Sequence, residues 1–399
     1  LFTAIENGKF IREDEWQYMV ARPIETERGM DGASDLFSPG YFKVFLKANE
    51  EALIYAITAL TKEERAQRGS VKKLDSDIKS LPEISNIGKV LKNSIRKFIV
   101  SRNSGNTVIA GYPWFLDWGR DTLICLRGII SAGFIDEAKS IVKEFASFEQ
   151  SGTLPNVIRG GDTSNRDTSD APLWLFVAVD DIIRKEGVDF LQSNCKGRTL
   201  KDVLKSIADN YRLGTPNGIK MDQDSGLIYS PTHFTWMDTN YPAGTPREGY
   251  PIEIQALWFK ATSLLSKIFP DEKQWKKISN QVRKSILTYF LIDKEGDKTT
   301  SNRTYLSDCL HTKGFQKAQK AEKDDHIRPN QLFAITFEAV VKTEVCKGII
   351  SSCEDLIVPG AIRTLADHPV DYELPIYHRN QLINNPSLHY YGKYTDDED

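Results

Sequence analysis

The sequence predicts a mainly α-helical protein, a toroid of helical hairpins that follows the end of an all-β region. From residue 83 onward apolar residues recur at helical spacing, so that each set shares one helix face. Long loops rich in Gly, Pro, Asp and Trp separate the predicted helices, and loops of that length usually carry function. Hairpins whose loops gather at one end build a pocket there. An irregular helical bundle with the same loops is the alternative.

The first 60 residues predict β structure. Two short apolar runs, 42–46 and 51–57, are separated by a polar tripeptide and predict a final hairpin. Residues 61–82 are mostly charged or polar, without apolar spacing to bury, and predict a linker.

The helical part follows in order along the chain. The first helix begins after residue 83, where Ile87, Leu91 and Ile95 share a face. The longest loops between helices cover 153–170 and 220–246. The later helices are predicted at 122–132, 136–147, 171–185, 199–211, 249–268, 272–290, 331–340 and 343–354.

Composition narrows the class of partner. The chain has 399 residues with 52 Lys and Arg against 55 Asp and Glu, a net charge of -3. That balance creates no long-range field for nucleic acid or an anionic membrane, and it permits a neutral partner. No stretch approaches the roughly 20 apolar residues that span a bilayer. The five cysteines lack metal or disulfide spacing and favour a reducing compartment, so we expect a cytoplasmic protein. No feature of the sequence indicates an oligomeric state.

Phosphate, acyl-transfer and metal chemistry lack their motifs. The sequence contains no Walker loop, no G-x-G-x-x-G after a strand and no G-x-S-x-G elbow. Its six histidines form no i, i+4 ligand pair, so we predict no metal site and no cofactor.

The segment 110–128, AGYPWFLDWGRDTLICLRG, is the richest in candidate binding residues. Trp114 and Trp118 offer flat apolar faces to the C–H side of a pyranose ring. Arg120 and Asp121 offer directed donors and acceptors for its hydroxyl groups. A tryptophan-rich core edge with one buried Arg/Asp pair is the structural alternative.

Two further clusters have the same character. The LPN segment with Asn156 leads to DAPLW, where Ser169 or Asp170 can N-cap the next helix. The run HFTWMD places Asp238 directly after Trp236 and Met237. Burial in such an apolar setting raises a carboxyl pKa and keeps the group protonated, as a general acid requires. A turn aspartate bonded to its own backbone is the alternative for Asp238.

The remaining clusters lie at predicted helix starts. The run PREGYPIEIQ carries Arg247 in a loop and Glu253 in the first turn, where an acidic side chain binds a ligand or only compensates the helix dipole. Arg328 and Arg363 are expected to brace loops through carboxylates, and His326 to serve as a structural hydrogen bonder.

Taken in this order, the clusters resemble the amylo-α-1,6-glucosidase domain of glycogen debranching enzymes, over residues from about 87 to 372. The resemblance rests on GYPWFLDWGRDT, LPN with DAPLW, TWMD, PREGYPIEIQALW and IRPNQLFAIT. It implies an (α/α)6 toroid over residues 83–399, preceded by the remnant of an N-terminal β-sandwich domain over 1–60. It also implies inverting hydrolysis of the single α-1,6-linked glucose at a glycogen branch point, on an α-glucan or branched malto-oligosaccharide.

The resemblance assigns roles to individual residues. Asp238 of TWMD looks like the general acid. The other matching positions look like residues that bind the sugar: Trp114, Trp118, Arg120, Asp121, Asn156, Asp170, Trp236, Arg247 and Glu253.

The general base implied by the resemblance follows a Y-H-x-G-T-x-W type segment, which this chain lacks up to Asp399. We expect the base beyond Asp399, in a domain that is incomplete at its C-terminal end; a divergent domain without a base is the alternative. Two other functions stay open. One is a toroidal glucosidase for another α-glucosidic linkage, and the other is a glucan-binding module without catalysis.

Overall fold

A computed structural model describes residues 2–5, 8–23, 26, 32–52, 54–57, 87–103, 105–112, 115–238, 246–294, 303–366, 370–373, 375, 377–378 and 381–382. The chain divides into two compact units, Leu1–Val90 and Leu91–Asp399. The first is built mostly from strands, and the second mostly from helices.

The described residues of the first unit form the strands β1 (Phe2–Ile5), β2 (Lys9–Ala21), β3 (Ala33–Lys43) and β4 (Ile54–Ile57). β2 pairs antiparallel with β3, and β1 pairs antiparallel with β4. The predicted hairpin between 42–46 and 51–57 is therefore wrong, because the two runs pair with earlier strands instead of each other. Trp16 of β2 faces Phe37 of β3 with ring centroids 5.0 Å apart, and this cross-strand contact helps set the register. The predicted linker 61–82 lies outside the described residues.

The second unit is mainly helical, as predicted. Its helices are α4 (Ile87–Phe98, which begins in the first unit), α5 (Gly119–Ser131), α6 (Ile135–Ser147), α7 (Ala171–Glu186), α8 (Leu200–Leu213), α9 (Ile252–Ile268), α10 (Gln274–Ser285), α11 (Leu332–Thr336) and α12 (Thr343–Cys353), with short turns η1 (Val188–Gln192), η2 (Ile286–Phe290), η3 (Ala318–Lys320), η4 (Pro329–Gln331) and η5 (Glu354–Leu356).

Short antiparallel ladders connect these helices. Their strands are β5 (Ile99–Arg102), β6 (Gly105–Val108), β7 (Asp117–Trp118), β8 (Val157–Ile158), β9 (Asn194–Cys195), β10 (Arg198–Thr199), β11 (Lys220–Met221), β12 (Ile228–Tyr229), β13 (Gly249–Pro251), β14 (Leu291–Lys294), β15 (Arg303–Leu306), β16 (Cys309–His311), β17 (Glu322–Lys323), β18 (Ile357–Val358), β19 (Ala361–Ile362), β20 (Tyr377–His378) and β21 (Gln381–Leu382).

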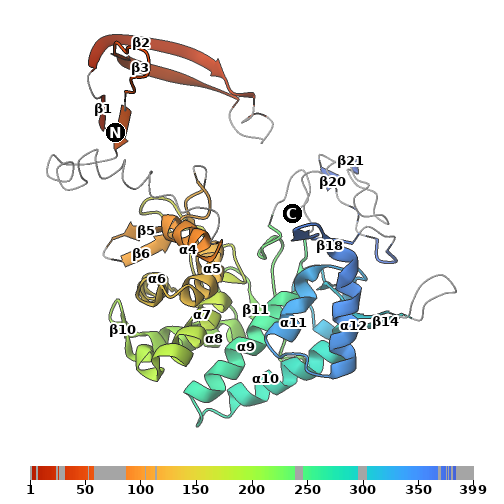
Figure 1. Ribbon diagram of the computed structural model, residues 1–399. Coiled ribbons are helices and arrows are strands. Elements are labelled where there is room, and N and C mark those ends of the chain that lie inside the picture. The colour runs from red at the N-terminus through yellow and green to blue at the C-terminus, as the bar shows by residue number, and fades with distance from the viewer. Residues whose placement is uncertain are drawn as a thin grey trace. The chain divides into compact units, whose positions relative to one another are not determined.

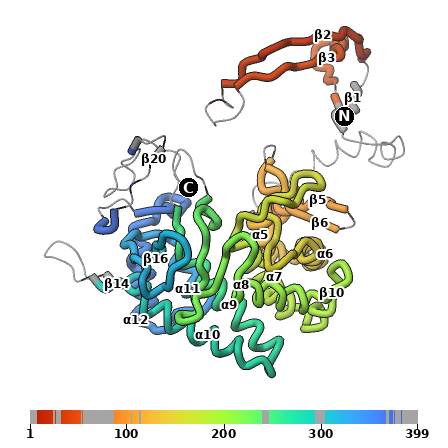
Figure 2. Tube along the Cα trace, turned by 180° about the vertical axis from the view of Figure 1, so that it is seen from behind, coloured from red at the N-terminus to blue at the C-terminus, as the bar shows by residue number. Residues whose placement is uncertain are grey.

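Alternate helices form the interior of the second unit. α5 packs on α7, α7 on α9 and α9 on α11, while α6, α8, α10 and α12 pack against this series (Figure 1). The sequence explains the division. α7 and α9 are apolar on nearly all sides and are buried almost throughout, whereas α6, α8 and α10 keep one polar face for solvent. Seen from behind, α9 again lies between α7 and α11 (Figure 2).

Most predicted helices differ from the structure by one to three residues at an end; α5, for example, begins at Gly119 instead of residue 122. The structure gives a local reason for three of the differences. The helix predicted at 249–268 begins at Ile252, because Gly249 adopts φ +131° and belongs to β13, and Tyr250 precedes a proline. The helix predicted at 272–290 ends at Ser285 and continues as a wider turn, η2. The helix predicted at 331–340 closes at Thr336, near Glu338 with φ 61°.

A close backbone contact positions the start of α5. β7 pairs with β8, and Gly119 N donates to Asn156 O at 2.8 Å. A Cβ at Gly119 would lie 2.3 Å from Pro155 O, so only glycine fits there. The WGRD and LPN motifs are thus two sides of one junction.

None of the helices that the structure describes is long and apolar enough to cross a membrane. All five cysteines are free thiols.

Candidate active site

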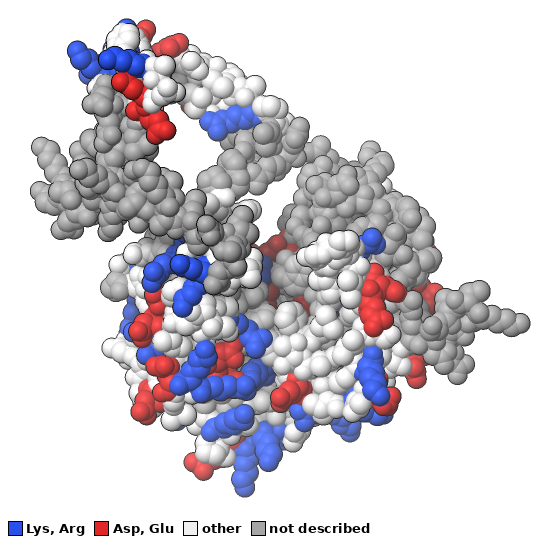
Figure 3. Space-filling view, viewed as in Figure 1, with Lys and Arg blue, Asp and Glu red and all other residues white. Residues whose placement is uncertain are grey.

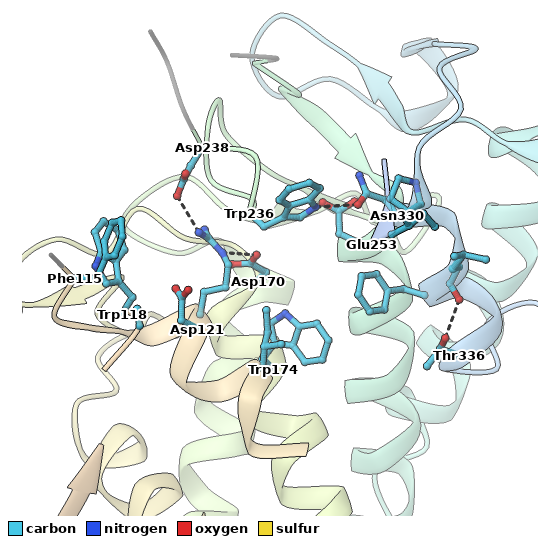
Figure 4. A pocket seen from close by; sticks show the side chains of 17 residues that line it. Phe115, Trp118, Asp121, Asp170, Trp174, Trp236, Asp238, Glu253, Asn330 and Thr336 are labelled. Carbon is cyan, nitrogen blue, oxygen red and sulfur yellow. Dashed lines mark hydrogen bonds and ion pairs between the residues drawn. The ribbon is translucent and has the colours of Figure 1, made fainter. Parts of the chain in front are cut away.

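A cavity of the second unit lies where α5, α7 and α9 begin, beside the short helix α11. Its volume is about 720 Å³, within the range of small-molecule sites. Figure 4 shows the side chains that line it. The lining comprises Ala110, Phe115, Trp118, Arg120, Asp121, Ile124, Asp170, Trp174, Trp236, Asp238, Glu253, Pro329, Asn330, Leu332, Phe333, Thr336 and Ile362.

Arg120, in the first turn of α5, joins two carboxylates from distant parts of the chain. Its Nε donates to Asp170 Oδ2 at 2.7 Å, and its Nη1 donates to Asp238 Oδ2 at 2.9 Å (Figure 4). Burial alone would lower the pKa of Arg120, but the two carboxylates outweigh burial and raise that pKa, so the guanidinium is always charged. Its Nη2 is buried and has no partner among the described residues. An unpaired buried donor at a cavity wall is suited to a ligand oxygen.

Asp170 does not cap α7 with its side chain, contrary to the capping interpretation. It occupies the N-cap position, yet its carboxylate accepts hydrogen bonds from Arg120 and from Thr168 Oγ1, the latter at 2.7 Å. Thr168 Oγ1 in turn accepts from Ala171 N at 3.3 Å and supplies the cap. The carboxylate of Asp170 therefore forms an ion pair with Arg120. The buried Arg/Asp pair of the structural alternative is thus present in the structure.

Asp238 lies in a polar setting, which corrects the expected apolar burial. Its neighbour Met237 is buried, but the Asp238 side chain is 34% exposed and forms the ion pair with Arg120. The carboxylate faces the cavity with one oxygen held by the guanidinium.

Asp121 is exposed toward the cavity, one residue after Arg120. The protein atoms around it displace part of its solvent and raise its pKa, and the nearby Arg120 opposes that effect.

Indole rings make up much of the cavity wall. Trp118 and Trp236 lie on either side of Asp121 in Figure 4, with Trp174 below. Trp174 packs edge-on against Phe333, with ring centroids 5.5 Å apart. Flat apolar rings next to charged groups are typical of a site for an amphipathic ligand such as a sugar. Trp114 lies outside the described residues.

Glu253 lies at the base of the cavity and is held by Arg247. Arg247 Nη2 donates to Glu253 Oε2 at 2.7 Å, and Arg247 Nε donates to Asp308 Oδ2 at 2.8 Å. All three residues are buried. Burial raises the pKa of Glu253, and Arg247 opposes that effect. Arg247 adopts φ 46°, an uncommon conformation outside glycine, which these ion pairs hold in place.

Asp308 connects this ion pair to Trp236. Its Oδ1 accepts from Asn330 Nδ2 at 2.8 Å, and Asn330 Oδ1 accepts from Trp236 Nε1 at 2.9 Å. The Trp236 ring is therefore oriented by a buried chain of hydrogen bonds that ends at Arg247.

Another buried carboxylate, that of Asp324, contacts the backbone of Asp308. Its Oδ1 accepts from Asp308 N at 2.9 Å, and its Oδ2 contacts His311 Nε2 at 2.8 Å and His326 Nδ1 at 3.2 Å. Burial alone would raise the pKa of Asp324, but the contacts with His326 and His311 outweigh burial and hold that pKa well below its usual range. His326 thus contacts a buried carboxylate, in keeping with the structural role expected of it.

The structure brings together seven of the predicted site residues at the cavity: Trp118, Arg120, Asp121, Asp170, Trp236, Asp238 and Glu253. It does not place Arg247 or Asn156 in the lining. Arg247 lies behind Glu253, and Asn156 is buried at the α5 junction, where its Oδ1 has no partner among the described residues. Arg328 contacts Asp308 at 3.7 Å, the loop-bracing role expected of it.

Sequence reasoning missed several residues of the site. Trp174 is the fourth residue of α7 and directly follows the DAPL run, so its place beside Asp170 was a usable signal. Asn330 belongs to the IRPNQ motif, two residues after the arginine that is expected to brace a loop. Phe333 belongs to the longer IRPNQLFAIT run. Asp308 lies in no such motif, and only the tertiary fold brings it behind the cavity, against Arg247 and Asn330.

Among the residues that the structure describes, no group of three or more His, Cys, Asp or Glu side chains is arranged to hold a metal ion.

The comparisons with known proteins agree with the motifs. Residues 92–393 match the family described as amylo-alpha-1,6-glucosidase, and residues 1–53 match the glycogen debranching enzyme N-terminal family. The chain is also similar to the glycogen debranching enzyme of Saccharomyces cerevisiae, at 24% identity over 354 residues. That similarity covers 69% of this chain and 23% of the relative, so the chain spans about a quarter of the relative's length. The chain belongs to the amylo-alpha-1,6-glucosidase family, a family of glycoside hydrolases of the debranching type.

Proposed function

We propose that this protein removes the single α-1,6-linked glucose left at a branch point of glycogen or of a branched malto-oligosaccharide, with inversion at the anomeric carbon. The observation that carries it is the ion-pair arrangement of Arg120, which holds Asp170 and Asp238 at the wall of an indole-lined cavity. A neutral sugar fits a cavity where rings alternate with charged groups.

The domain organisation belongs to the same proposal. The alternating contacts of α5, α7, α9 and α11, with α6, α8, α10 and α12 packed on them, are those expected of part of an (α/α)6 toroid over residues 83–399. Residues 1–60 would be the end of a β-sandwich domain, joined by the linker 61–82. The free thiols favour a reducing compartment, the cytoplasm.

In this mechanism Asp238 is the general acid. In its protonated form Oδ2 accepts from Arg120 Nη1, and Oδ1 carries the proton that passes to the glycosidic oxygen. Arg120 fixes the position of Asp238 relative to Asp170 because two different nitrogens hold the two carboxylates.

The other cavity residues bind the glucose. The unpaired Nη2 of Arg120 donates to a sugar hydroxyl, and the exposed carboxylate of Asp121 accepts from one. Trp118, Trp174 and Trp236 contact the C–H faces of the ring. Arg247 serves the site from behind, by holding Glu253. Inversion requires a base carboxylate about 6.5–9.5 Å from the acid, with a water between it and the anomeric carbon.

The test measures glucose release from a malto-oligosaccharide that carries one α-1,6-linked glucosyl stub. The full-length protein is compared with its Asp238→Asn variant, and Asp136→Asn, at an exposed site on α6, serves as control. We expect a loss of kcat/KM of about 10²–10⁴-fold for Asp238→Asn, the usual contribution of a general acid. Asp136→Asn should behave like the parent. Equal activity of all three proteins would remove Asp238 from the mechanism.

A second substrate separates acid catalysis from structural damage. Fluoride leaves from α-glucosyl fluoride without protonation, so Asp238→Asn should hydrolyse this substrate nearly as fast as the parent. A variant that hydrolyses neither substrate has lost more of the site than its general acid. Proton NMR of the first product shows β-glucose if the reaction inverts.

Two alternatives are outcomes of the same experiment. Faster cleavage of a linear α-1,4 chain or of trehalose would indicate a toroidal glucosidase for another linkage. Sugar binding without turnover by the full-length protein would indicate a glucan-binding module. Asp170 and Glu253 each form an internal ion pair with an arginine, which occupies their carboxylates. This observation favours the glucan-binding module.

A further inference from the structure

A basic groove, formed by three adjoining cavities, crosses the second unit and borders the sugar cavity at Thr336, which lines both. The cavities measure about 480, 420 and 440 Å³, and neighbouring cavities share Arg127, Asp181, Arg184 and Lys267 in their linings. Figure 3 shows Lys and Arg side chains gathered over the lower helices of this unit. The cations of the groove are Arg127, Arg184, Lys185, Lys201, Lys260, Lys267, Lys276 and Arg283.

The charge of the groove is opposite to that of the chain. Its lining has eight Lys and Arg against four acidic residues, Asp180, Asp181, Asp189 and Glu338, whereas the whole chain carries a net charge of -3. A concave surface of one sign concentrates counter-ions of the other sign. The groove therefore favours an anion.

Internal ion pairs account for only part of this positive charge. Asp180 accepts from Lys260 at 2.5 Å and from Arg184 at 2.8 Å, and Asp181 accepts from Arg127 at 2.9 Å. Lys267 and Lys276 form no ion pair with any residue that the structure describes. Two ammonium groups from α9 and α10 are thus available at the same cavity.

Arg283 of α10 is preorganised for an oxyanion. Its guanidinium lies 4.6 Å from the centroid of the Phe259 ring, and its Nη2 donates to Glu338 O at 2.7 Å. Its Nε is buried and has no hydrogen-bond partner within the described ranges. A guanidinium held in this way at the cavity wall can present its remaining N–H groups to a phosphate. Ser263 and Asn280 add neutral polar groups to the same lining.

We propose that this groove binds a phosphate group, either free or carried by a small molecule, with Arg283, Lys267 and Lys276 as its ligands. Each cavity has the size of a small-molecule site, which favours a small ligand over a polymer. Although Thr336 lines both the groove and the sugar cavity, the surplus positive charge of the groove favours an anion over a neutral glucan. Phosphate is the common oxyanion that an arginine fork and two ammonium groups neutralise together.

Isothermal titration of the full-length protein tests this site with two probes, inorganic phosphate and glucose 6-phosphate, with KCl holding the ionic strength constant. We expect one binding event per chain and a loss of affinity of about tenfold for Arg283→Gln, which is one charge-assisted hydrogen bond. Lys267→Gln, at an exposed position, should also weaken binding. Lys313→Gln, exposed and outside the groove, is the matched control.

The affinities for the two probes distinguish free phosphate from a phosphorylated small molecule. Equal affinity for the two probes supports a site for the phosphate group alone, and tighter binding of glucose 6-phosphate supports a phosphorylated small molecule. Absence of binding by both probes, or affinities that Arg283→Gln and Lys267→Gln leave unchanged, would overturn the proposal. Glucose release is not the readout, so this test stands even if the hydrolase function fails.

Discussion

At the scale of single residues, Arg120 organises the cavity because one planar group satisfies two carboxylates from separate loops. Its Nε and Nη1 point in different directions, toward Asp170 and Asp238. Lysine carries the same charge on one rotating ammonium, so it cannot reproduce both contacts.

We therefore expect Arg120→Lys to lower kcat/KM for the branched substrate by roughly 100-fold, the scale of a misplaced catalytic group. The folded state should survive, since the charge is retained. Steady-state kinetics with Arg12→Lys, an exposed arginine of the first unit, as control measure the effect. Full activity of Arg120→Lys would show that the two-point contact is dispensable.

The hydrogen bond between Trp236 and Asn330 makes a second prediction at this scale. Asn330→Ala removes the acceptor of Trp236 Nε1, and Trp236→Phe removes the donor. Each should weaken sugar binding, but the double variant should cost less than the sum by about 1 kcal/mol, the usual net value of a hydrogen bond. Titration with a malto-oligosaccharide measures the cycle. Additive losses would mean that the contact does not orient the ring.

Motif reasoning finds site residues when they stand next to other polar or aromatic residues in the sequence. Trp118, Arg120 and Asp121 come from one run, and Asp238 closely follows Trp236. Asp308 could not be found in this way, because its partners Arg247 and Asn330 lie 61 and 22 residues away. The local sequence also cannot show that the carboxylate of Asp238 pairs with the guanidinium of Arg120 in α5.

At the scale of secondary-structure elements, the junction before α5 depends on close approach of two backbones. A methyl group on Gly119 would collide with Pro155 O, whereas one on Gly128, later in the same helix, would meet no atom within 4 Å beyond the backbone of its own helix.

This contrast gives a matched pair of substitutions. Gly119→Ala should destabilise the fold by about 1–3 kcal/mol, because the added methyl overpacks the junction. Gly128→Ala should stabilise the fold by up to about 1 kcal/mol, because alanine favours the helix. Urea unfolding of both variants measures the free energies of unfolding. Similar values for the two would contradict the junction as described.

Helix positions were predictable wherever periodicity and capping agree. α8 begins at Leu200, one residue from its prediction, and Thr199 and Asp202 form a capping box there. α9 could not be placed as well, since β13 pairs Gly249 with His311, a partner that local sequence does not reveal. The predicted strand pairing of the first unit was wrong for the same reason. β1 (2–5) pairs with β4 (54–57), which lies far from it in the sequence.

At the scale of the whole molecule, stability should depend on acid through Asp324. The folded pKa of this carboxyl is lowered, whereas an unfolded aspartate titrates near about 3.9. The unfolded chain then binds more protons in that range, so the stabilising contribution is complete above about pH 4 and is lost as the pH falls further.

Asp324→Asn should therefore lower the free energy of unfolding by about 3 kcal/mol near pH 7, the scale of a broken buried pair. The difference from the parent should shrink as the pH falls below about 4. Urea unfolding from pH 2 to 7 measures both curves, with Asp136→Asn as control. A difference that stays constant down to pH 2 would exclude titration of Asp324 as the cause.

The wide sequence separation within the Arg120 cluster also determines when the cavity can form during synthesis. Asp170 follows Arg120 by 50 residues and Asp238 follows it by 118. At a translation rate of roughly 5–20 residues per second, Arg120 emerges about 6–24 s before its second carboxylate. The nascent chain thus holds a positive charge, destined for burial, without its full set of partners during that interval. The cavity cannot be complete before Ile362, the lining residue furthest along the chain, has been synthesised.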